Sequence, residues 1–249
     1  MINQSVLLNS VFKYLKLLYY LFYRTKIFFP KKKYSLLGED IFIEKYFKNK
    51  SKGFYIDVGC YHPLDGNNTQ LLYKKGWNGI NLDINYYSIK LFNFLRRKDI
   101  NIHSGISNKK GRLTMYYRKE INMLNTLDKK IAKMQFRNGY KKKNIQVNTL
   151  NHYITKHSKK IETIDFINID VEGGELNVLK SLNFKTYKPQ LICIEIHNIK
   201  KMFDTNYKYL KSNKVYNFLI KKEYKIVWKN KYSFIFERKL NFFKNTFAK

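Results

Sequence analysis

The stretch GFYIDVGCYHPLDGNNTQLLYKKGWNGINLD, residues 53–83, predicts one complete strand–helix–strand unit. Gly53–Val58 is a short apolar run that ends in Asp and Gly, which is typical of a buried parallel strand. The segment Asn68–Lys75 has a helical composition that ends at Gly76, and Gly79–Asp83 is a second apolar strand. Two such strands joined by a helix indicate a parallel sheet covered by helices.

The same alternation continues through the chain. Further strands are predicted at Ile100–His103, Gly111–Tyr117, Ile164–Asp170 and Leu191–Ile196, and helices at Tyr86–Arg97, Glu175–Leu182 and Tyr207–Lys221. Tyr224–Trp228 and Ser233–Glu237 flank a turn and predict a closing hairpin. The polar, Lys-rich stretch 118–144 reads as an irregular insertion. We therefore expect an α/β fold with a doubly wound, mostly parallel sheet and a C-terminal antiparallel hairpin, in one domain over residues 34–249.

The composition limits the function classes. The 249 residues carry a net charge of +31, and their 44% hydrophobic content excludes a disordered basic tail. Only seven of the 49 basic residues are Arg, the usual reader of phosphates and bases, so nucleic acid is not the expected partner. Cys60 and Cys193 lie inside apolar runs without metal-ligand spacing, which predicts reduced thiols and a cytoplasmic location.

Residues 1–33 form a separate N-terminal region. The Leu-, Tyr- and Phe-rich run 5–29 is interrupted by Lys13, Lys16, Arg24 and Lys26, so it is too charged for a membrane span. No small-residue cleavage site follows it. It predicts an amphipathic helix, for which two interpretations stay open. The helix either lies at the anionic inner face of a membrane as a peripheral anchor, or packs on the catalytic domain or a second subunit.

Polar residues follow each of five predicted strands. In an open α/β sheet, ligands bind beyond the carboxyl ends of the strands, near the point where the strand order reverses. These strand ends therefore predict a ligand site, and they contain Asp57 and Gly59, Asp83, Ser104 and Gly105, Asp170 and Glu172, and Glu195 and His197.

The turn after the first strand indicates which ligand. It lacks both the G-x-G-x-x-G fingerprint and the phosphate-binding P-loop, which favours a ligand without phosphates. Asp83 lies 26 residues after Asp57 at the end of the second strand, where a carboxylate can accept both ribose hydroxyls. A nucleoside without phosphates points to S-adenosylmethionine.

Three segments carry a family resemblance: YIDVGCYHPLDGNNTQLLYKKGWNGINLDIN, IDFINIDVEGGELNVLKSL and PQLICIEIHN. They resemble the FkbM-type S-adenosylmethionine-dependent methyltransferases, and the upstream YSLLGED resembles the lead-in of a glycan-associated branch. The resemblance covers roughly residues 34–199 and implies a Rossmann-like methyltransferase fold and O-methylation, often of sugars. The common Gly-Ala of the first turn is Gly59-Cys60 here, which keeps a small side chain.

The expected cofactor site follows the strand ends. Asp57, Gly59 and Cys60 are assigned to the methionine end, Asp83 to the ribose, and Ser104 and Gly105 to the adenine. Asn68, at the start of the first helix, and Asp170 complete the set, and the run 67–69 is expected to cap that helix. His62, in the loop after the first strand, is a further candidate contact.

The expected catalytic residues are Asp170, Glu172, Glu195 and His197. Asp170 and Glu172 alternate in an extended segment, so both side chains are expected to point the same way. One interpretation is a general base acting on an acceptor hydroxyl. The other is a divalent metal, for which Asp170, Glu195 and His197 would be the ligands. A structural hydrogen-bonded pair of Glu195 and His197 is the alternative to both.

The leading function is therefore an S-adenosylmethionine-dependent O-methyltransferase acting on a sugar or glycan precursor. The charge of +31 keeps an RNA methyltransferase as an alternative. A non-catalytic, membrane-associated scaffold that retains the fold is the third.

Overall fold

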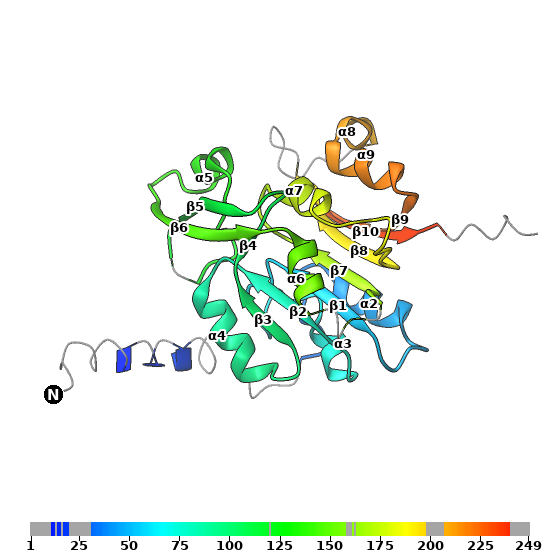
Figure 1. Ribbon diagram of the computed structural model, residues 1–249, viewed down its shortest axis with the longest axis horizontal. Coiled ribbons are helices and arrows are strands. Elements are labelled where there is room, and N and C mark those ends of the chain that lie inside the picture. The colour runs from blue at the N-terminus through cyan, green and yellow to red at the C-terminus, as the bar shows by residue number, and fades with distance from the viewer. Residues whose placement is uncertain are drawn as a thin grey trace, which may run out of the picture.

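The computed structural model describes residues 11–12, 14–15, 17–19, 31–119, 121–157, 161, 163–197 and 207–239. Within this part, the main element is a seven-stranded sheet in the order β3-β2-β1-β7-β8-β10-β9 (Figure 1). Its strands are β1 (Phe54–Val58), β2 (Asn78–Asp83), β3 (Ile100–His103), β7 (Phe166–Ile169), β8 (Leu191–Glu195), β9 (Tyr224–Asn230) and β10 (Ser233–Arg238).

The pairing confirms the predicted fold class. Strands β3, β2, β1, β7 and β8 pair in parallel, and β10 pairs antiparallel with both β8 and β9. The closing hairpin thus adds β10 inside the sheet and leaves β9 at its edge. The strand order reverses between β1 and β7, which is where a doubly wound sheet opens a crevice.

Side-chain alternation along the strands builds a core on each face of this sheet. Ile56 and Val58 belong to a cluster with residues of α6 (Leu150–Lys156), α7 (Glu175–Lys180) and α9 (Lys214–Lys221). Tyr55 belongs to a second cluster with residues of α2 (Glu39–Tyr46) and α3 (Gln70–Lys74). Because successive strand residues point to opposite faces, the continuous apolar runs of the sequence serve both cores.

The stretch 118–144 was predicted to be an irregular insertion, but it contains a helix and the start of a strand. Strand β5 (Gly111–Tyr117) pairs antiparallel with β6 (Lys141–Asn148), and β6 pairs in parallel with the short β4 (Gly105–Ile106). Helix α5 (Lys129–Gln135) connects β5 to β6. The prediction failed because β6 begins with Lys-Lys-Lys-Asn, all exposed, and so shows no apolar run.

Two helix predictions also need correction. The expected helix Tyr207–Lys221 is divided into α8 (Tyr207–Ser212) and α9. The break falls at Asn213, whose side chain accepts hydrogen bonds from the first backbone N–H groups of α9. Helix α3 begins at Gln70, and Thr69 occupies its N-cap position without a side-chain capping bond. The Thr69 hydroxyl donates to Asp57 instead, and the Asn67 side chain accepts the backbone N–H of Thr69.

The N-terminal prediction lies mostly outside the described residues. Residues 11–12, 14–15 and 17–18 are helical, and Leu17 packs against a cluster of Tyr61, Leu91 and Ile121. In the part of the chain that the structure describes, no helix is long and apolar enough to cross a membrane.

Candidate functional site

A cavity of about 940 Å³ lies at the carboxyl ends of the strands. Its wall includes most of the predicted site residues: Gly59, Asp83, Ser104, Gly105, Asp170, Glu172, Glu195 and His197. The rest of the wall comes from residues 122–137, around α5, and from residues 209–215 of α8 and α9. In Figure 1 these two regions lie at the upper edge of the molecule, on either side of α7. The structure therefore places the cavity where the strand-end pattern predicts it.

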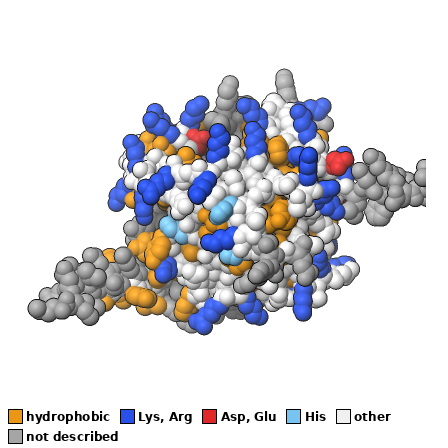
Figure 2. Space-filling view, viewed as in Figure 1, with side chains coloured by type: hydrophobic (Ala, Val, Ile, Leu, Met, Phe, Trp, Pro, Cys, Tyr) orange, Lys and Arg blue, Asp and Glu red, His pale blue; other side chains and the backbone are white. Residues whose placement is uncertain are grey.

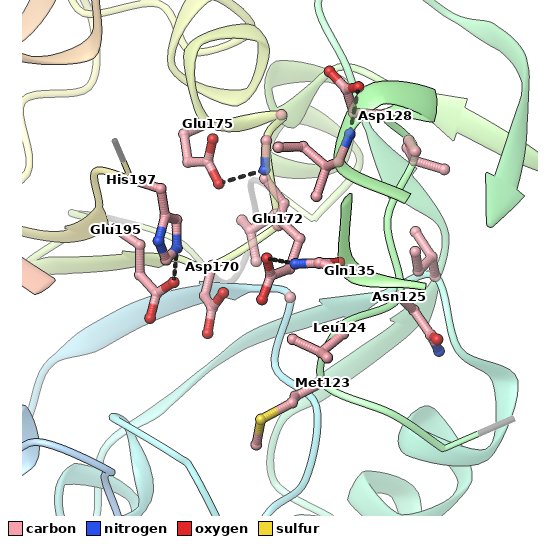
Figure 3. Close-up of a pocket in the computed structure, with 18 of the residues that line it drawn as sticks. Met123, Leu124, Asn125, Asp128, Gln135, Asp170, Glu172, Glu175, Glu195 and His197 are labelled. Atoms are coloured by element: carbon pink, nitrogen blue, oxygen red, sulfur yellow. Dashed lines mark hydrogen bonds and ion pairs between the residues drawn. The ribbon is translucent and has the colours of Figure 1, made fainter. Parts of the chain in front are cut away.

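Three carboxylates form the floor of this cavity. Asp170 follows β7, Glu195 ends β8, and Glu172 lies between β7 and α7. Each offers one oxygen, and these three oxygens lie within 4.8 Å of one another. Figure 3 shows the three side chains reaching toward one space, which Met123 and Leu124 border from the other side.

The backbone at Glu172 has a different conformation from the predicted extended one. Its φ of 54° is left-handed, so the segment after β7 is not extended as expected. The Thr126 hydroxyl donates to the Glu172 carbonyl at 2.6 Å. The Gln135 amide donates to the Glu172 carboxylate at 2.5 Å. The region around α5 therefore holds both the strained backbone and the side chain of this residue.

Burial and crowding change the acidity of the floor. Burial, followed by repulsion from Glu195, raises the pKa of Asp170 well above its usual range. Burial, followed by repulsion from Glu172, does the same to the pKa of Glu195. Among the described residues, His197 is the one basic side chain within ion-pair distance of these three acids. The cluster is therefore acid-rich and short of positive charge, which favours bound protons or a cationic ligand.

His197 forms the pair with Glu195 that the sequence suggested. Its Nε2 lies 2.7 Å from the Glu195 carboxylate. Its ring stacks on Tyr232, with the ring centroids 4.8 Å apart. The Tyr209 hydroxyl donates to the His197 carbonyl. Two contacts thus orient the imidazole and a third fixes its backbone at the edge of the cavity, as a positioned acid–base group requires.

Gly59 and Asp83 line the cavity at the ends of β1 and β2. Gly59 has a φ of 81°, and a Cβ at this position would lie 1.7 Å from the carbonyl oxygen of Asp170. Only glycine fits this close approach of the β1 turn to the floor. The Asp83 carboxylate accepts the backbone N–H groups of Tyr61 at 2.8 Å and Asn85 at 2.7 Å. Burial raises the pKa of Asp83 to about 6, and Asn85, not Asp83, caps the following helix α4 (Tyr86–Leu95).

Ser104 and Gly105 border the cavity from the second sheet. Gly105 belongs to β4 and pairs with Val147 of β6. A Cβ at Gly105 would lie 2.8 Å from the Val147 side chain, so the close pairing needs glycine. The Ser104 hydroxyl donates to the carbonyl of Gln146 at 3.3 Å. Gly105 is thus held in a short strand, and Ser104 lies directly before it.

Three predicted cofactor residues, Asp57, Cys60 and Asn68, do not line the cavity. Asp57 is fully buried on the face of the sheet that carries Tyr55, and it accepts hydrogen bonds from Asn168 at 2.8 Å and Thr69 at 2.9 Å. Asn68 donates to Asn168, and Cys60 packs against Ile89 and Phe92. The same holds for His62, which is buried and accepts the N–H of Leu64. Strand alternation sends the Asp57 side chain under the helices, so its role here is to support the loop.

No sequence pattern indicated the buried Arg96, which bonds to the loop 63–69 on the side away from the cavity. Its side chain is completely buried, and it donates to Thr69 at 2.6 Å, Asn67 at 2.5 Å and the Pro63 carbonyl at 3.0 Å. It also lies 4.0 Å from the Asp99 carboxylate. Arg96 thus connects α4 to the segment 63–69. Its positive charge also stabilises the buried carboxylates of Asp57 and Asp99, the acids behind the sheet.

Several lining residues had no assignment from the sequence. Glu175 lines the cavity, and its carboxylate accepts the N–H of Gly173 at 2.9 Å, so the last acid of the quoted Asp-Val-Glu-Gly-Gly-Glu stretch was an available signal. The others lie outside the matched segments and include Met123, Leu124, Asn125, Ile131, Gln135, Tyr209 and Tyr232.

A doubly wound sheet with a carboxylate-lined cavity at its strand ends, and without a phosphate-binding loop, defines the class of Rossmann-like methyltransferases. The comparison with family models supports this class, because the model described as the methyltransferase FkbM domain matches residues 57–225. That match spans more than half of the chain, so the chain belongs to the FkbM methyltransferase family. The search of curated proteins gave no match.

Proposed function

We propose that the protein is an S-adenosylmethionine-dependent O-methyltransferase that methylates a hydroxyl of a sugar or glycan precursor. The observation that carries this proposal is the acid-rich floor beside the Gly59 turn. Three carboxylates within 4.8 Å of one another suit a cationic sulfonium better than they suit a polyanion.

The residues present fit a nucleoside cofactor. Each Asp83 oxygen accepts one backbone N–H and keeps a second lone pair, which is what two ribose hydroxyls need. Gly59 allows close approach to the backbone at the β1 turn, and Ser104 and Gly105 border the adjoining part of the cavity. When bound, the cofactor supplies an electrophilic methyl group. The chain contributes binding, orientation and a place for the acceptor proton.

The acceptor proton would be taken by the His197–Glu195 pair. His197 lies at the cavity wall with its ring fixed by Tyr232, and Glu195 bonds to Nε2. This arrangement can hold an imidazolium once a hydroxyl has lost its proton. Glu172, held by Gln135, would bind another hydroxyl of the same acceptor.

A sugar is the acceptor that the remaining wall supports best. Asn125 and Gln135 line it with amide groups, and Tyr209 and Tyr232 line it with aromatic rings. Directional polar groups together with aromatic rings suit a polyhydroxyl ligand that has apolar ring faces.

We further propose that the enzyme works in the cytoplasm and attaches to the anionic inner face of a membrane through residues 5–33. The free, buried thiols of Cys60 and Cys193 support a reducing compartment. The basic and aromatic composition of residues 5–33 supports the attachment.

Calorimetric titration with S-adenosylmethionine and S-adenosylhomocysteine tests the cofactor assignment. We expect binding at one site per chain, and an affinity at least about tenfold weaker in Asp83→Ala, because charged hydrogen bonds contribute about 1.5–3 kcal/mol. Glu44→Ala is the matched control, because Glu44 is exposed on α2, away from the cavity. Absence of binding to the folded wild-type protein would refute the proposal.

The acceptor is tested by transfer of a labelled methyl group. We expect label in nucleotide sugars or glycan precursors and none in RNA. Label found in RNA alone would replace the glycan acceptor with the nucleic-acid alternative.

A further inference from the structure

The outer face of α4 carries alternating aromatic and basic side chains. Tyr86, Lys90 and Phe94 follow one another at helical spacing on α4, and Arg97 lies just after its end. All four are exposed, Tyr86 by 44% and Phe94 by 52%. The Lys90 ammonium lies 5.3 Å from the centre of the Tyr86 ring, and the Arg97 guanidinium lies 5.9 Å from that of Phe94. No acidic residue occurs in α4. A single exposed aromatic is ordinary, but a stripe of paired aromatics and cations is not.

The described N-terminal residues continue this face. Leu17 packs against the cluster of Tyr61, Leu91 and Ile121, to which Tyr87 and Leu95 of α4 also pack. The other apolar side chains described there are exposed by 46–73%: Val11, Phe12, Tyr14, Leu15, Leu18 and Tyr19. Figure 2 shows hydrophobic side chains at the lower left, where this segment leaves the domain. Among the described residues of this segment, Leu17 packs on the domain and the other apolar side chains are largely exposed.

The charge of this region is one-sided. Residues 1–38 contain seven Lys and Arg residues and no Asp or Glu, although the whole chain has 18 acids. Basic side chains can extend their charge toward headgroups while their apolar stems and the neighbouring aromatic rings lie in the interface. The complementary partner is therefore an anionic surface with an apolar interior.

We propose that the outer face of α4 and the adjoining N-terminal residues together dock on an anionic phospholipid bilayer. This inference extends the peripheral attachment proposed above, and it adds that the methyltransferase domain itself lies on the lipid. Ile121 belongs to the Leu17 cluster and directly precedes the residues 122–125 that line the cavity. The docked face is consequently joined to the cavity wall.

Vesicle flotation of the full chain, without cofactor, tests this surface. The probes are phosphatidylcholine vesicles with and without phosphatidylglycerol, and the variant is Phe94→Ser combined with Arg97→Glu. We expect binding only to the anionic vesicles, and at least about 25-fold weaker binding by the variant. Each basic charge at such a surface contributes about fivefold in affinity. Replacing Arg97 by Glu changes the charge by two, so it should weaken binding by about 25-fold. Higher salt should also weaken binding.

A matched control is Ile220→Ser combined with Lys221→Glu, since these exposed residues lie on α9. It should bind anionic vesicles within about twofold of wild type, because it lies outside the docking face. S-adenosylmethionine titration of both variants verifies the fold and keeps the two proposals separate, because vesicle binding needs no methyl transfer. Equal binding to neutral vesicles, an unaffected Phe94/Arg97 variant, or self-association that depends on Phe94 would each overturn the docking surface.

Discussion

Two groups of buried acids in this protein differ in how their charge is offset. Behind the sheet, burial raises the pKa of Asp57 and of Asp99, and the positive charge of the buried Arg96 that they share opposes this rise. On the cavity floor, Asp170 and Glu195 have no such partner among the described Lys and Arg side chains, and neighbouring acids raise their pKa further. One group therefore includes a buried cation and the other does not.

This difference separates support from function. A buried acid with a buried cation and several donors is a structural element, whereas clustered acids without one destabilise the fold and are retained where they serve a site. The contrast explains why Asp57, which a strand-end pattern assigns to the cofactor, lies outside the cavity, while Asp170 lies in it.

The largest effect is expected from Arg96→Ala, which removes the buried cation from the acids behind the sheet. Removing this cation leaves Asp99 and Asp57 buried without compensation, so the free energy of unfolding should fall by about 3–5 kcal/mol. Urea denaturation measures this, and Arg97→Ala on the exposed face should change it by no more than about 0.5 kcal/mol. Equal effects of the two substitutions would show that the buried charges do not depend on Arg96.

Asp170→Asn should have the opposite effect on stability and a large effect on activity. The raised pKa of Asp170 means that the folded state binds a proton that the unfolded state releases, so the carboxyl costs stability as pH rises above its unfolded value near 3.8. Asn removes this cost, and we expect unchanged or higher stability at neutral pH together with a loss of methyl transfer of about 100-fold or more.

Asp57→Asn provides the matched comparison for Asp170→Asn. Asp57 accepts from Asn67, Thr69 and Asn168, so its amide variant turns a donor toward donors and should lose about 1–3 kcal/mol of stability. If both Asn variants destabilise alike, the distinction between the two groups fails.

A smaller effect is expected from pH on cofactor affinity through Asp83. Its pKa of about 6 means that the carboxylate is formed as pH rises from 5 to 7, and a carboxylate accepts ribose hydroxyls better than the neutral acid. Affinity should therefore rise by up to about tenfold over this interval, and Asp83→Asn should flatten the Asp83 part of that rise. If the affinity of Asp83→Asn rises with pH as steeply as that of the wild type, the titrating group belongs to the cavity floor and not to Asp83.

The smallest effect is expected from metal removal. Two of the three floor carboxylates already bond to protein groups, Glu195 to His197 and Glu172 to Gln135, and the raised pKa of Asp170 favours its neutral form. Excess chelator should therefore leave methyl transfer unchanged. Loss of activity that is restored by Mg²⁺ would show instead that a cation neutralises the floor.

The sequence predicted the sheet and one wall of the cavity, because apolar runs and the residues that follow them are local signals. Gly59, Asp83, Asp170 and Glu195 were found in this way, since parallel strands bring their carboxyl ends together. The metal set predicted with His197 differs from the geometric one, in which Glu172 takes its place, because a left-handed backbone at Glu172 cannot be inferred from alternation.

The other wall could not be predicted. Strand β6 starts with lysines that face solvent, so its pairing with β5 depends on register and not on an apolar pattern. Arg96 ends a helix in a chain rich in basic residues, and only the tertiary structure shows that it is buried among acids. Long-range contacts of this kind leave no periodic signal.

Proton release on cofactor binding shows directly whether the acidic floor receives a sulfonium. A positive sulfonium beside Asp170 and Glu195 should lower their pKa and release protons, whereas S-adenosylhomocysteine has a neutral sulfur and the same nucleoside. Calorimetry in buffers of different ionisation enthalpy should therefore find more protons released by S-adenosylmethionine than by S-adenosylhomocysteine, and Asp170→Asn should reduce the difference. Equal proton release by the two ligands, or no binding of either, would contradict an acidic floor built for a sulfonium.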